Sequence, residues 1–297
     1  MTDETRQPPR RRPLRILWWV LLAGIALIIL SNTLLPDLDL SGEDRIALVR
    51  VEGMILDSQQ TVGDLKKYSE NPFVKAIVVR IDSPGGGVVP SQEIHDAVLR
   101  VRTKQKKTVI ASMGTVAASG GYYIAAAADR IVANPGTLTG SIGVIMELAN
   151  LEGLMKKIGV ESVVVKSGRH KDVGSPFRAM KAEDRQILQT VMDDVHNQFI
   201  EAVAAGRALS VPDVRAIADG RIFTGRQAMD AKLVDQLGDL NDAIKVAADM
   251  AGIEGEPKVV EPKKRFSIRD MIDSRLANVL PKLDFHTGVS LKYLMAF

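Results

Sequence analysis

One serine stands where its hydroxyl could act as a nucleophile. Ser119 lies in the stretch GTVAASGGYYIAAAADR, residues 114–130, between two alanines and two glycines. It follows a predicted strand and precedes good helix formers, so we expect it at a helix N-terminus, where unpaired amides and the helix dipole favour negative charge. Serine is also a favoured helix cap, and small residues permit close packing. The stretch alone is compatible with either a catalytic or a structural serine.

A serine nucleophile needs a base, and the segment KSGRHKDVGSPFR, residues 166–178, offers two lysines. A lysine acts as a base only when neutral, so its pKa must fall from about 10.4 towards neutrality, which costs roughly 4 kcal/mol. Lys171 lies beside Arg169 and His170, whose positive potential would help, and beside Asp172, which would oppose the change. Lys166 is the rival on the same segment.

The sequence gives little support for catalysis by a thiol, a bound nucleotide, a metal ion or paired carboxylates. The chain has no cysteine, no phosphate-binding Gly-x-x-x-x-Gly-Lys-Ser/Thr loop and no Gly-x-Gly-x-x-Gly turn. Its four histidines show no metal-binding spacing and give no reason to choose one as the base: His95, His170, His196 and His286. The adjacent Asp193 and Asp194 point to different faces of a predicted helix, which favours solvation. We therefore expect no metal and no cofactor.

Strands and helices alternate around these residues. The spacing of apolar residues predicts strands over 44–55, 74–87, 107–114, 129–136 and 161–168, and a helix over 92–105. The strand that begins at residue 74 ends in a turn of Pro84 and three glycines, whose amides are candidates for an oxyanion hole. This alternation indicates an α/β fold with parallel pairing. A long helix over 180–206 follows, then shorter helices over 211–252, broken at glycines.

The N-terminus has the pattern of a membrane anchor. Residues 1–15 form a basic arm with a net charge of +3, and the run from Ile16 to Leu35 has no charge in 20 residues. At about 1.5 Å per residue this run spans roughly 30 Å, the thickness of a bilayer core. A cleavable signal peptide is the alternative, but its apolar region is shorter and ends in a small-x-small site. We expect an uncleaved anchor with a cytoplasmic N-terminus, and the catalytic domain outside the cytoplasm.

The two ends of the chain carry its excess of basic residues. Because the N-terminal arginines adjoin an apolar run rather than a folded face, we read them as a topology signal and expect no nucleic-acid partner. After a folded domain over 44–252, residues 257–297 form a basic extension with eight Lys/Arg against four Asp/Glu. It ends in LKYLMAF, which is apolar enough to enter a groove that takes hydrophobic peptides.

Several ordered segments resemble one known family. They are IDSPGG, AASGGYYIAAAADRIVANPGTLTGSIGV, KSGRHKD with SPFR, and DGRIFTGRQAMDAKLVDQLG, within residues 44–240. Together they resemble the short form of bacterial signal peptide peptidase A, a family of membrane-anchored serine/lysine-dyad peptidases. The resemblance implies a ClpP/crotonase-like core of repeated ββα units that form a spiral. It also implies a helical C-terminal part and one preceding transmembrane helix.

The resemblance assigns roles to individual residues. It implies that Ser119 is the nucleophile and Lys171 the general base, with the amides of Gly86 and Gly120 at the oxyanion. It makes Ser141 in TGSIGV a candidate for orienting the lysine amine. It further implies a homo-oligomeric ring, an octamer, in which Lys171 of one copy serves Ser119 of its neighbour. The substrates would be apolar peptides, above all cleaved signal peptides, which are hydrolysed through an acyl-enzyme.

Three other functions are compatible with parts of the sequence. A protein of this fold can be a membrane scaffold without peptidase activity, because the same fold can carry different functions. The same peptidase can degrade damaged membrane proteins or cleave a regulatory substrate instead of signal peptides. A bare transmembrane interaction protein is the third alternative, and the ordered motifs argue against it.

Overall fold

The structure, a computed structural model, describes Trp18, Trp19, Gly24 and residues 43–262 and 292–295. The chain divides into two units, Met1–Glu43 and Asp44–Phe297. Most of the predicted anchor and the whole basic arm lie outside the described residues. Within the part described, no helix is both long and apolar enough to cross a membrane.

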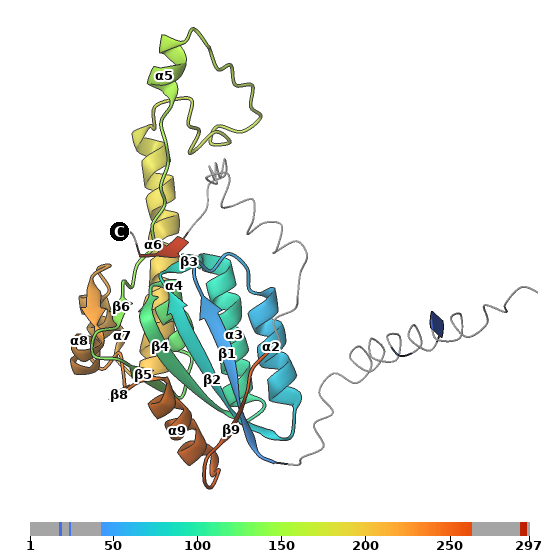
Figure 1. Ribbon diagram of the computed structural model, residues 1–297. Coiled ribbons are helices and arrows are strands. Elements are labelled where there is room, and N and C mark those ends of the chain that lie inside the picture. The colour runs from blue at the N-terminus through green and yellow to red at the C-terminus, as the bar shows by residue number, and fades with distance from the viewer. Residues whose placement is uncertain (1–17, 20–23, 25–42, 263–291, 296–297) are drawn as a thin grey trace, which may run out of the picture. The chain divides into compact units, whose positions relative to one another are not determined.

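Eight strands of the described part form one sheet, in the order β7-β6-β4-β2-β1-β9, with β5 joining β4 to β8. These strands are β1 (Arg45–Glu52), β2 (Val74–Ser83), β4 (Thr108–Ala118), β5 (Arg130–Ala133), β6 (Leu138–Gly140), β7 (Ile222–Thr224), β8 (Gln236–Leu237) and β9 (Lys258–Val260). All the pairs are parallel except β6 with β7. Figure 1 shows the sheet between layers of helices, so the predicted α/β fold is confirmed.

Eight helices accompany the sheet in the described part. They are α2 (Gln59–Glu70), α3 (Val88–Thr103), α4 (Gly120–Ala125), α5 (Glu152–Lys157), α6 (Ala182–Arg207), α7 (Val211–Ile217), α8 (Gly225–Asp230) and α9 (Leu240–Ala251). Successive residues of β1 face opposite sides of the sheet, as in any strand. Ile46 and Leu48 pack with α9, whereas Val49 and Val51 join the larger core with α2, α3 and α4.

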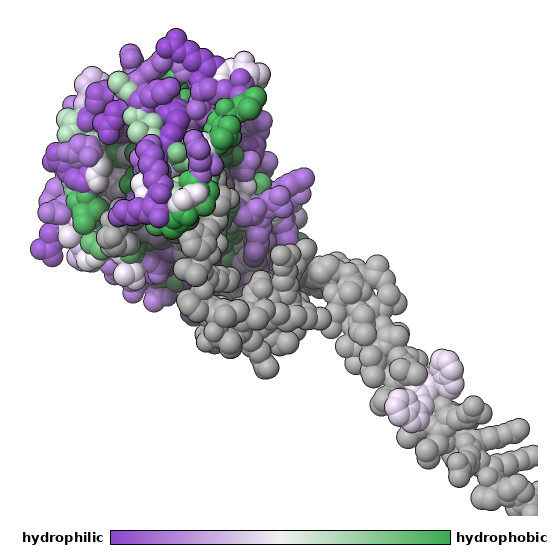
Figure 2. Space-filling model, turned by 90° about the horizontal axis from the view of Figure 1, so that it is seen from above, coloured by the Kyte–Doolittle hydropathy of each residue, from purple (hydrophilic) through white to green (hydrophobic). Residues whose placement is uncertain are grey.

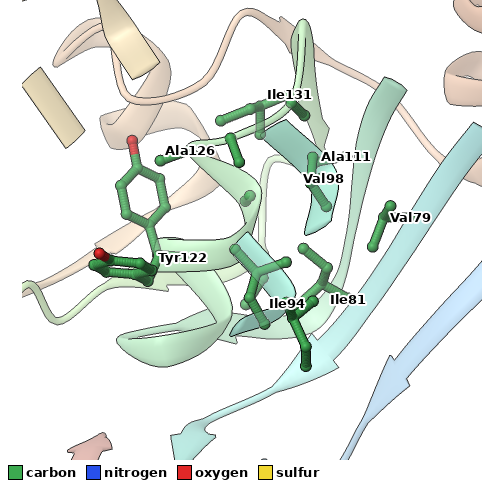
Figure 3. Close-up of a cluster of buried hydrophobic side chains, with 14 of the residues drawn as sticks. Val79, Ile81, Ile94, Val98, Ala111, Tyr122, Ala126 and Ile131 are labelled. Atoms are coloured by element: carbon green, nitrogen blue, oxygen red, sulfur yellow. The ribbon is translucent and has the colours of Figure 1, made fainter. Parts of the chain in front are cut away.

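The larger core carries the helix that follows Ser119. Figure 3 shows Ile94 and Val98 of α3 close to Val79 and Ile81 of β2, with Tyr122 of α4 at one side. Tyr122 is fully buried, and its hydroxyl donates a hydrogen bond of 2.9 Å to the carbonyl of Leu233. Because residues 125–128, at and after the end of α4, are alanines, this part of the chain packs closely in the same core.

The strand β4 changes partners along its length. Residues 110–113 pair with β5, whereas residues 116–118 pair with β6. At the fork, the carboxylate of Asp82 accepts a hydrogen bond of 3.1 Å from the amide of Val116. The last residue of β4, Ala118, pairs with Gly140. Ser119 therefore follows directly after the residues of β4 that pair with β6.

One predicted strand is wrong, and the later helices are confirmed. Residues 161–168 form no strand, and the side chains of Val163 and Val165 are 82% and 97% exposed. The β-branched run indicated a strand, but no strand among the described residues pairs with it. The long helix predicted over 180–206 is α6, and α7, α8 and α9 lie between the predicted glycine breaks.

Candidate active site

Ser119 lies in the tight turn between β4 and α4. Its backbone angles are φ 54° and ψ −116°, a strained conformation for a residue other than glycine. Two hydrogen bonds hold the turn, both of 2.8 Å: the Ser119 amide donates to the carbonyl of Gly140, and the Ser119 carbonyl accepts from the amide of Tyr123. The strain is therefore imposed by neighbours on both sides.

The Ser119 hydroxyl is buried and makes no hydrogen bond within the described residues. A capping serine would accept a hydrogen bond from an amide of the first helical turn, and Ser119 makes none. The capping alternative therefore has no support from the geometry. A strained residue with a buried, unpaired hydroxyl is characteristic of a functional site.

Two glycine amides approach this turn. The short strand β3 (Gly85–Gly87) crosses the start of α4, so that a Cβ added to Gly85 would lie 2.8 Å from the amide nitrogen of Gly120. A Cβ on Gly120 would collide with Ser91 Oγ, and one on Gly86 would lie 2.6 Å from the amide nitrogen of Ile55. The glycines of β3 thus meet the start of α4, next to Ser119, in a space that only glycine can fill.

Ser141 lies directly after the hydrogen-bond partner of Ser119. It follows Gly140 at the end of β6, is buried, and has a φ of 50°. Its amide donates a hydrogen bond of 2.8 Å to the carbonyl of Arg221. Ser141 is therefore beside the turn, and its role toward a lysine stays a prediction.

Lys171 lies on a different part of the molecule. It belongs to residues 147–181, here called the arm, which include α5 and extend beyond the end of α6 in Figure 1, away from the sheet. Lys171 is exposed, and within the described residues its amine takes part in no hydrogen bond or ion pair. The structure therefore does not bring Lys171 and Ser119 together within one chain.

The rival Lys166 is engaged in an ion pair. Its amine contacts the carboxylate of Asp172 and donates a hydrogen bond of 2.9 Å to the carbonyl of Arg169. Asp172 also accepts a hydrogen bond of 2.8 Å from Arg178 Nε. Arg178 first, and Lys166 second, hold the pKa of the Asp172 carboxyl well below its ordinary value. The amine of Lys166 is therefore engaged within the arm, whereas Lys171 is exposed, and the choice of Lys171 as the base stays a prediction.

A segment near the C-terminus lies beside Ser119. The strand β10 (Lys292–Leu294) pairs antiparallel with β3, opposite the three glycines. On its other edge, Ile145 and Lys292 exchange hydrogen bonds of 3.1 and 3.3 Å between their amides and carbonyls. Part of the apolar end LKYLMAF thus lies between β3 and Ile145, next to the turn that holds Ser119, and this space is here called the groove. β10 is therefore paired through main-chain groups with β3 on one edge and with Ile145 on the other.

Sequence reasoning missed the aromatic side chains that line this groove. Tyr123 of α4 and Phe199 of α6 contact Tyr293 of β10, and His95 of α3 packs on Tyr123. The tyrosine pair after Ser119 indicated only a helix, and Phe199 lay on the apolar stripe of the long helix. Two large aromatic residues close to a candidate nucleophile were the signal available. In the part of the chain that the structure describes, no group of His, Cys, Asp or Glu residues could hold a metal ion.

Residues 101–254, which include Ser119, Gly120 and Lys171, match Peptidase family S49. A putative protease of Synechocystis is 47% identical over 215 residues, which span 72% of this chain and 77% of that protein. The chain belongs to peptidase family S49. It is a serine peptidase of that family, and the resemblance inferred from the motifs is confirmed.

Two further relatives of this S49 peptidase carry more specific names. The putative signal peptide peptidase SppA of Enterococcus faecium is 36% identical over 213 residues, 67% of this chain and 62% of that protein. The chloroplastic serine protease SPPA of Arabidopsis thaliana is 34% identical over 232 residues, 73% of this chain but 34% of the plant protein. The S49 chain described here is thus much shorter than its plant relative.

Proposed function

We propose that this S49 peptidase is anchored in a membrane and hydrolyses released signal peptides and other apolar peptides with a Ser119/Lys171 dyad. The observation that carries the proposal is the strained, buried Ser119, whose hydroxyl has no hydrogen-bond partner among the described residues and which lies where the glycines of β3 meet α4. The name of the Enterococcus faecium relative supports the substrate class.

The proposed chemistry proceeds through an acyl-enzyme. Neutral Lys171 takes the Ser119 proton as the hydroxyl oxygen attacks a peptide carbonyl, and the amides of Gly86 and Gly120 stabilise the oxyanion. The protonated lysine then donates that proton to the leaving amine. Water, deprotonated by the same lysine, attacks the ester and releases Ser119. Ser141 would orient the amine of the lysine.

The dyad would be shared between copies in a homo-oligomeric ring, an octamer. Its support is the separation of Lys171, on the arm, from Ser119, in the body of the same chain. The arm also exposes large apolar side chains, among them Leu154, Ile158 and Val165. Figure 2 shows apolar residues (green) among hydrophilic ones (purple) on the face seen from above. Exposed apolar clusters of this kind mark interaction surfaces, and the proposed occupant is the neighbouring copy.

The proposal also includes a ClpP/crotonase-like fold and a membrane topology. The fork of β4 between β5 and β6 is compatible with a ClpP/crotonase-like spiral of ββα units. The apolar run Ile16–Leu35 would span the inner membrane once as a helix, with the N-terminus in the cytoplasm and the peptidase outside it. Membrane-derived peptides would then be released close to the groove. No cofactor and no nucleic acid are needed.

Labelling with a fluorophosphonate tests the nucleophile. The full chain in detergent should react at a single serine, which peptide mapping should place at Ser119. The same preparation should hydrolyse a synthetic signal peptide. Labelling of another serine, with Ser119→Ala still active, would overturn the assignment.

A reporter fused after Pro36 tests the topology. A periplasmic reporter such as alkaline phosphatase should be active, and a cytoplasmic one inactive. The opposite pattern would reverse the proposed orientation.

A further inference from the structure

A cavity of about 650 Å³ lies where the end of β1 meets the start of α2. Part of its lining is apolar and includes Met54, Leu56 and Ile94. The side chains of Met54 and Leu56 are 48% and 65% exposed, whereas Ile94 is buried. Exposed apolar side chains gathered around a cavity are characteristic of a binding surface.

Carboxylates dominate the charge of this cavity. Four of them line it: Glu52, Asp57, Asp64 and Glu261. Among the described residues, Arg50 is the only cation that lines it, and its guanidinium is shared between Glu261, at 3.0 and 3.2 Å, and Glu52, at 3.6 Å. Asp57 is exposed and makes no ion pair within the described part of the chain. The cavity therefore has an excess of negative charge and is here called the acidic pocket.

The acidic pocket adjoins the strand that carries Gly86. Ile55 lines the pocket, and its amide donates a hydrogen bond of 2.9 Å to the carbonyl of Gly85. The carbonyl of Ile55 accepts a hydrogen bond of 2.8 Å from the amide of Gly87. Neighbouring strands lie about 4.8 Å apart, and an extended peptide covers about 3.3 Å per residue. A peptide bound at Ser119 therefore needs only a few further residues to reach the pocket.

The pocket's lining fits a peptide that carries lysine or arginine beside apolar side chains. Signal peptides have this composition, because a positively charged region precedes their apolar segment. The lining fits a membrane surface less well, because anionic headgroups attract basic rather than acidic segments. Charge complementarity therefore favours a basic, partly apolar peptide as the occupant.

We propose that the acidic pocket is a second peptide-binding site, which holds the basic end of a substrate while its apolar part is cleaved at Ser119. This inference rests on the proposed function, because it takes Ser119 as the nucleophile. An exposed ion pair strengthens binding about 3-fold. Two such pairs, to Glu52 and Asp57, should strengthen binding about 10-fold.

Kinetics of the full chain in a non-ionic detergent test the site with two synthetic peptides. Both share one apolar segment, which follows three lysines in one peptide and three serines in the other. At low salt, KM for the lysine peptide should be about 10-fold lower than for the serine peptide. About 0.5 M salt should remove most of this difference, because it screens exposed charges. Equal KM values at low salt would overturn the proposal.

A double variant places the preference in the pocket. Glu52→Gln with Asp57→Asn should bring the KM ratio of the two peptides to about 1, because both charges are lost while the side chains keep their size. The matched control, Asp249→Asn with Glu254→Gln, removes two exposed carboxylates outside the pocket and should keep the 10-fold ratio. An unchanged ratio in the pocket variant would overturn the site.

Two other occupants would give different results. The sequence continues after Pro262 with Lys263, Lys264 and Arg265. If these residues fill the pocket, the wild type should show no preference, and replacing all three by serine should create one. If a second copy covers the pocket, Leu56→Ser should change the assembly seen in size-exclusion chromatography. Either result would overturn the proposal.

A binding measurement separates this proposal from the proposed function. In the Ser119→Ala chain, an anisotropy titration should give a Kd for the labelled lysine peptide about 10-fold below that of the serine peptide. If Ser119 is not the nucleophile, this difference remains, but hydrolysis does not depend on Ser119. If the acidic pocket is not a binding site, hydrolysis depends on Ser119, but the two Kd values are equal.

Discussion

The amide of Ser119 donates a hydrogen bond of 2.8 Å to the carbonyl of Gly140, so the end of β6 fixes the turn that presents the candidate nucleophile. Ser141 follows Gly140 directly and is held in turn by the carbonyl of Arg221. A chain of backbone hydrogen bonds thus joins β4, β6 and the start of β7. The position of the serine depends on this sheet edge rather than on side-chain contacts of its own.

Ser119→Ala and Lys171→Ala should each reduce hydrolysis of an apolar peptide more than about 1,000-fold, because either change removes the attacking pair. Circular dichroism should show an unchanged fold, since Lys171 is exposed and Ser119 loses only a hydroxyl. Lys166→Ala is the matched control and should keep activity within about 10-fold. Full activity of Lys171→Ala would direct attention to Lys166.

Mixing the two inactive chains before assembly should restore activity. A working site needs the serine of one copy and the lysine of its neighbour, so a 1:1 statistical mixture should recover about a quarter of the wild-type rate. The rate should be measured after size-exclusion chromatography confirms mixed rings. Mixed rings without activity would contradict a dyad shared between copies.

Gly120→Ala should strongly lower kcat, because its Cβ would collide with Ser91 Oγ and lie 3.2 Å from the carbonyl oxygen of Tyr293, which would displace the Gly120 amide. Loss of one oxyanion donor from its place costs about 100- to 1,000-fold in kcat. Gly136→Ala is the matched control, since a Cβ there has no neighbour within 4 Å. Similar kcat values for the two variants would show that the Gly120 amide has no catalytic role.

Arg178→Gln should loosen the arm at neutral pH. Arg178 and Lys166 lower the pKa of Asp172 below its ordinary value of 3.8, so the folded arm binds this proton less readily than the unfolded arm. The stabilisation is therefore complete above about pH 4 and is lost as the pH falls through the lower, folded pKa. Hydrogen exchange of residues 165–180, corrected for intrinsic rates, should show wild-type protection from about pH 5 to 7.

In Arg178→Gln that protection should be lost throughout the same pH range. Arg185→Gln changes an exposed arginine without an ion pair in the described part of the chain, and it should leave the exchange as in the wild type. Equal exchange in the two variants would mean that Asp172 does not hold the arm.

Local patterns predicted much of the fold. The apolar run of β2 and the stripe of α6 are strong signals, because burial on both faces of a strand or on one face of a helix leaves a regular spacing. The run 161–168 misled because β-branched residues favour strands only where a partner strand exists. Its valines are exposed in this chain, so the pattern did not mark a buried strand.

For a similar reason, the sequence predicted some parts of the candidate site and not others. Ser119 and the glycine turn are local features, and their residue types restrict what they can do. The distance between Ser119 and Lys171, and the meeting of Tyr293 with Phe199, depend on contacts between remote segments. Sequence spacing carries no information about such contacts. The cluster of Tyr123, Phe199 and Tyr293 therefore could not be predicted, although each residue was identified.

Tyr122 and Tyr123 are adjacent in α4, and successive residues of a helix point about 100° apart. Tyr122 anchors the core through Leu233, while Tyr123 forms a wall of the groove. One helical turn therefore contributes both to the core and to the aromatic cluster beside Ser119. Because Phe199 of α6 is also fully buried in this core, a mutation of either aromatic residue will cost stability as well as change the surroundings of Ser119.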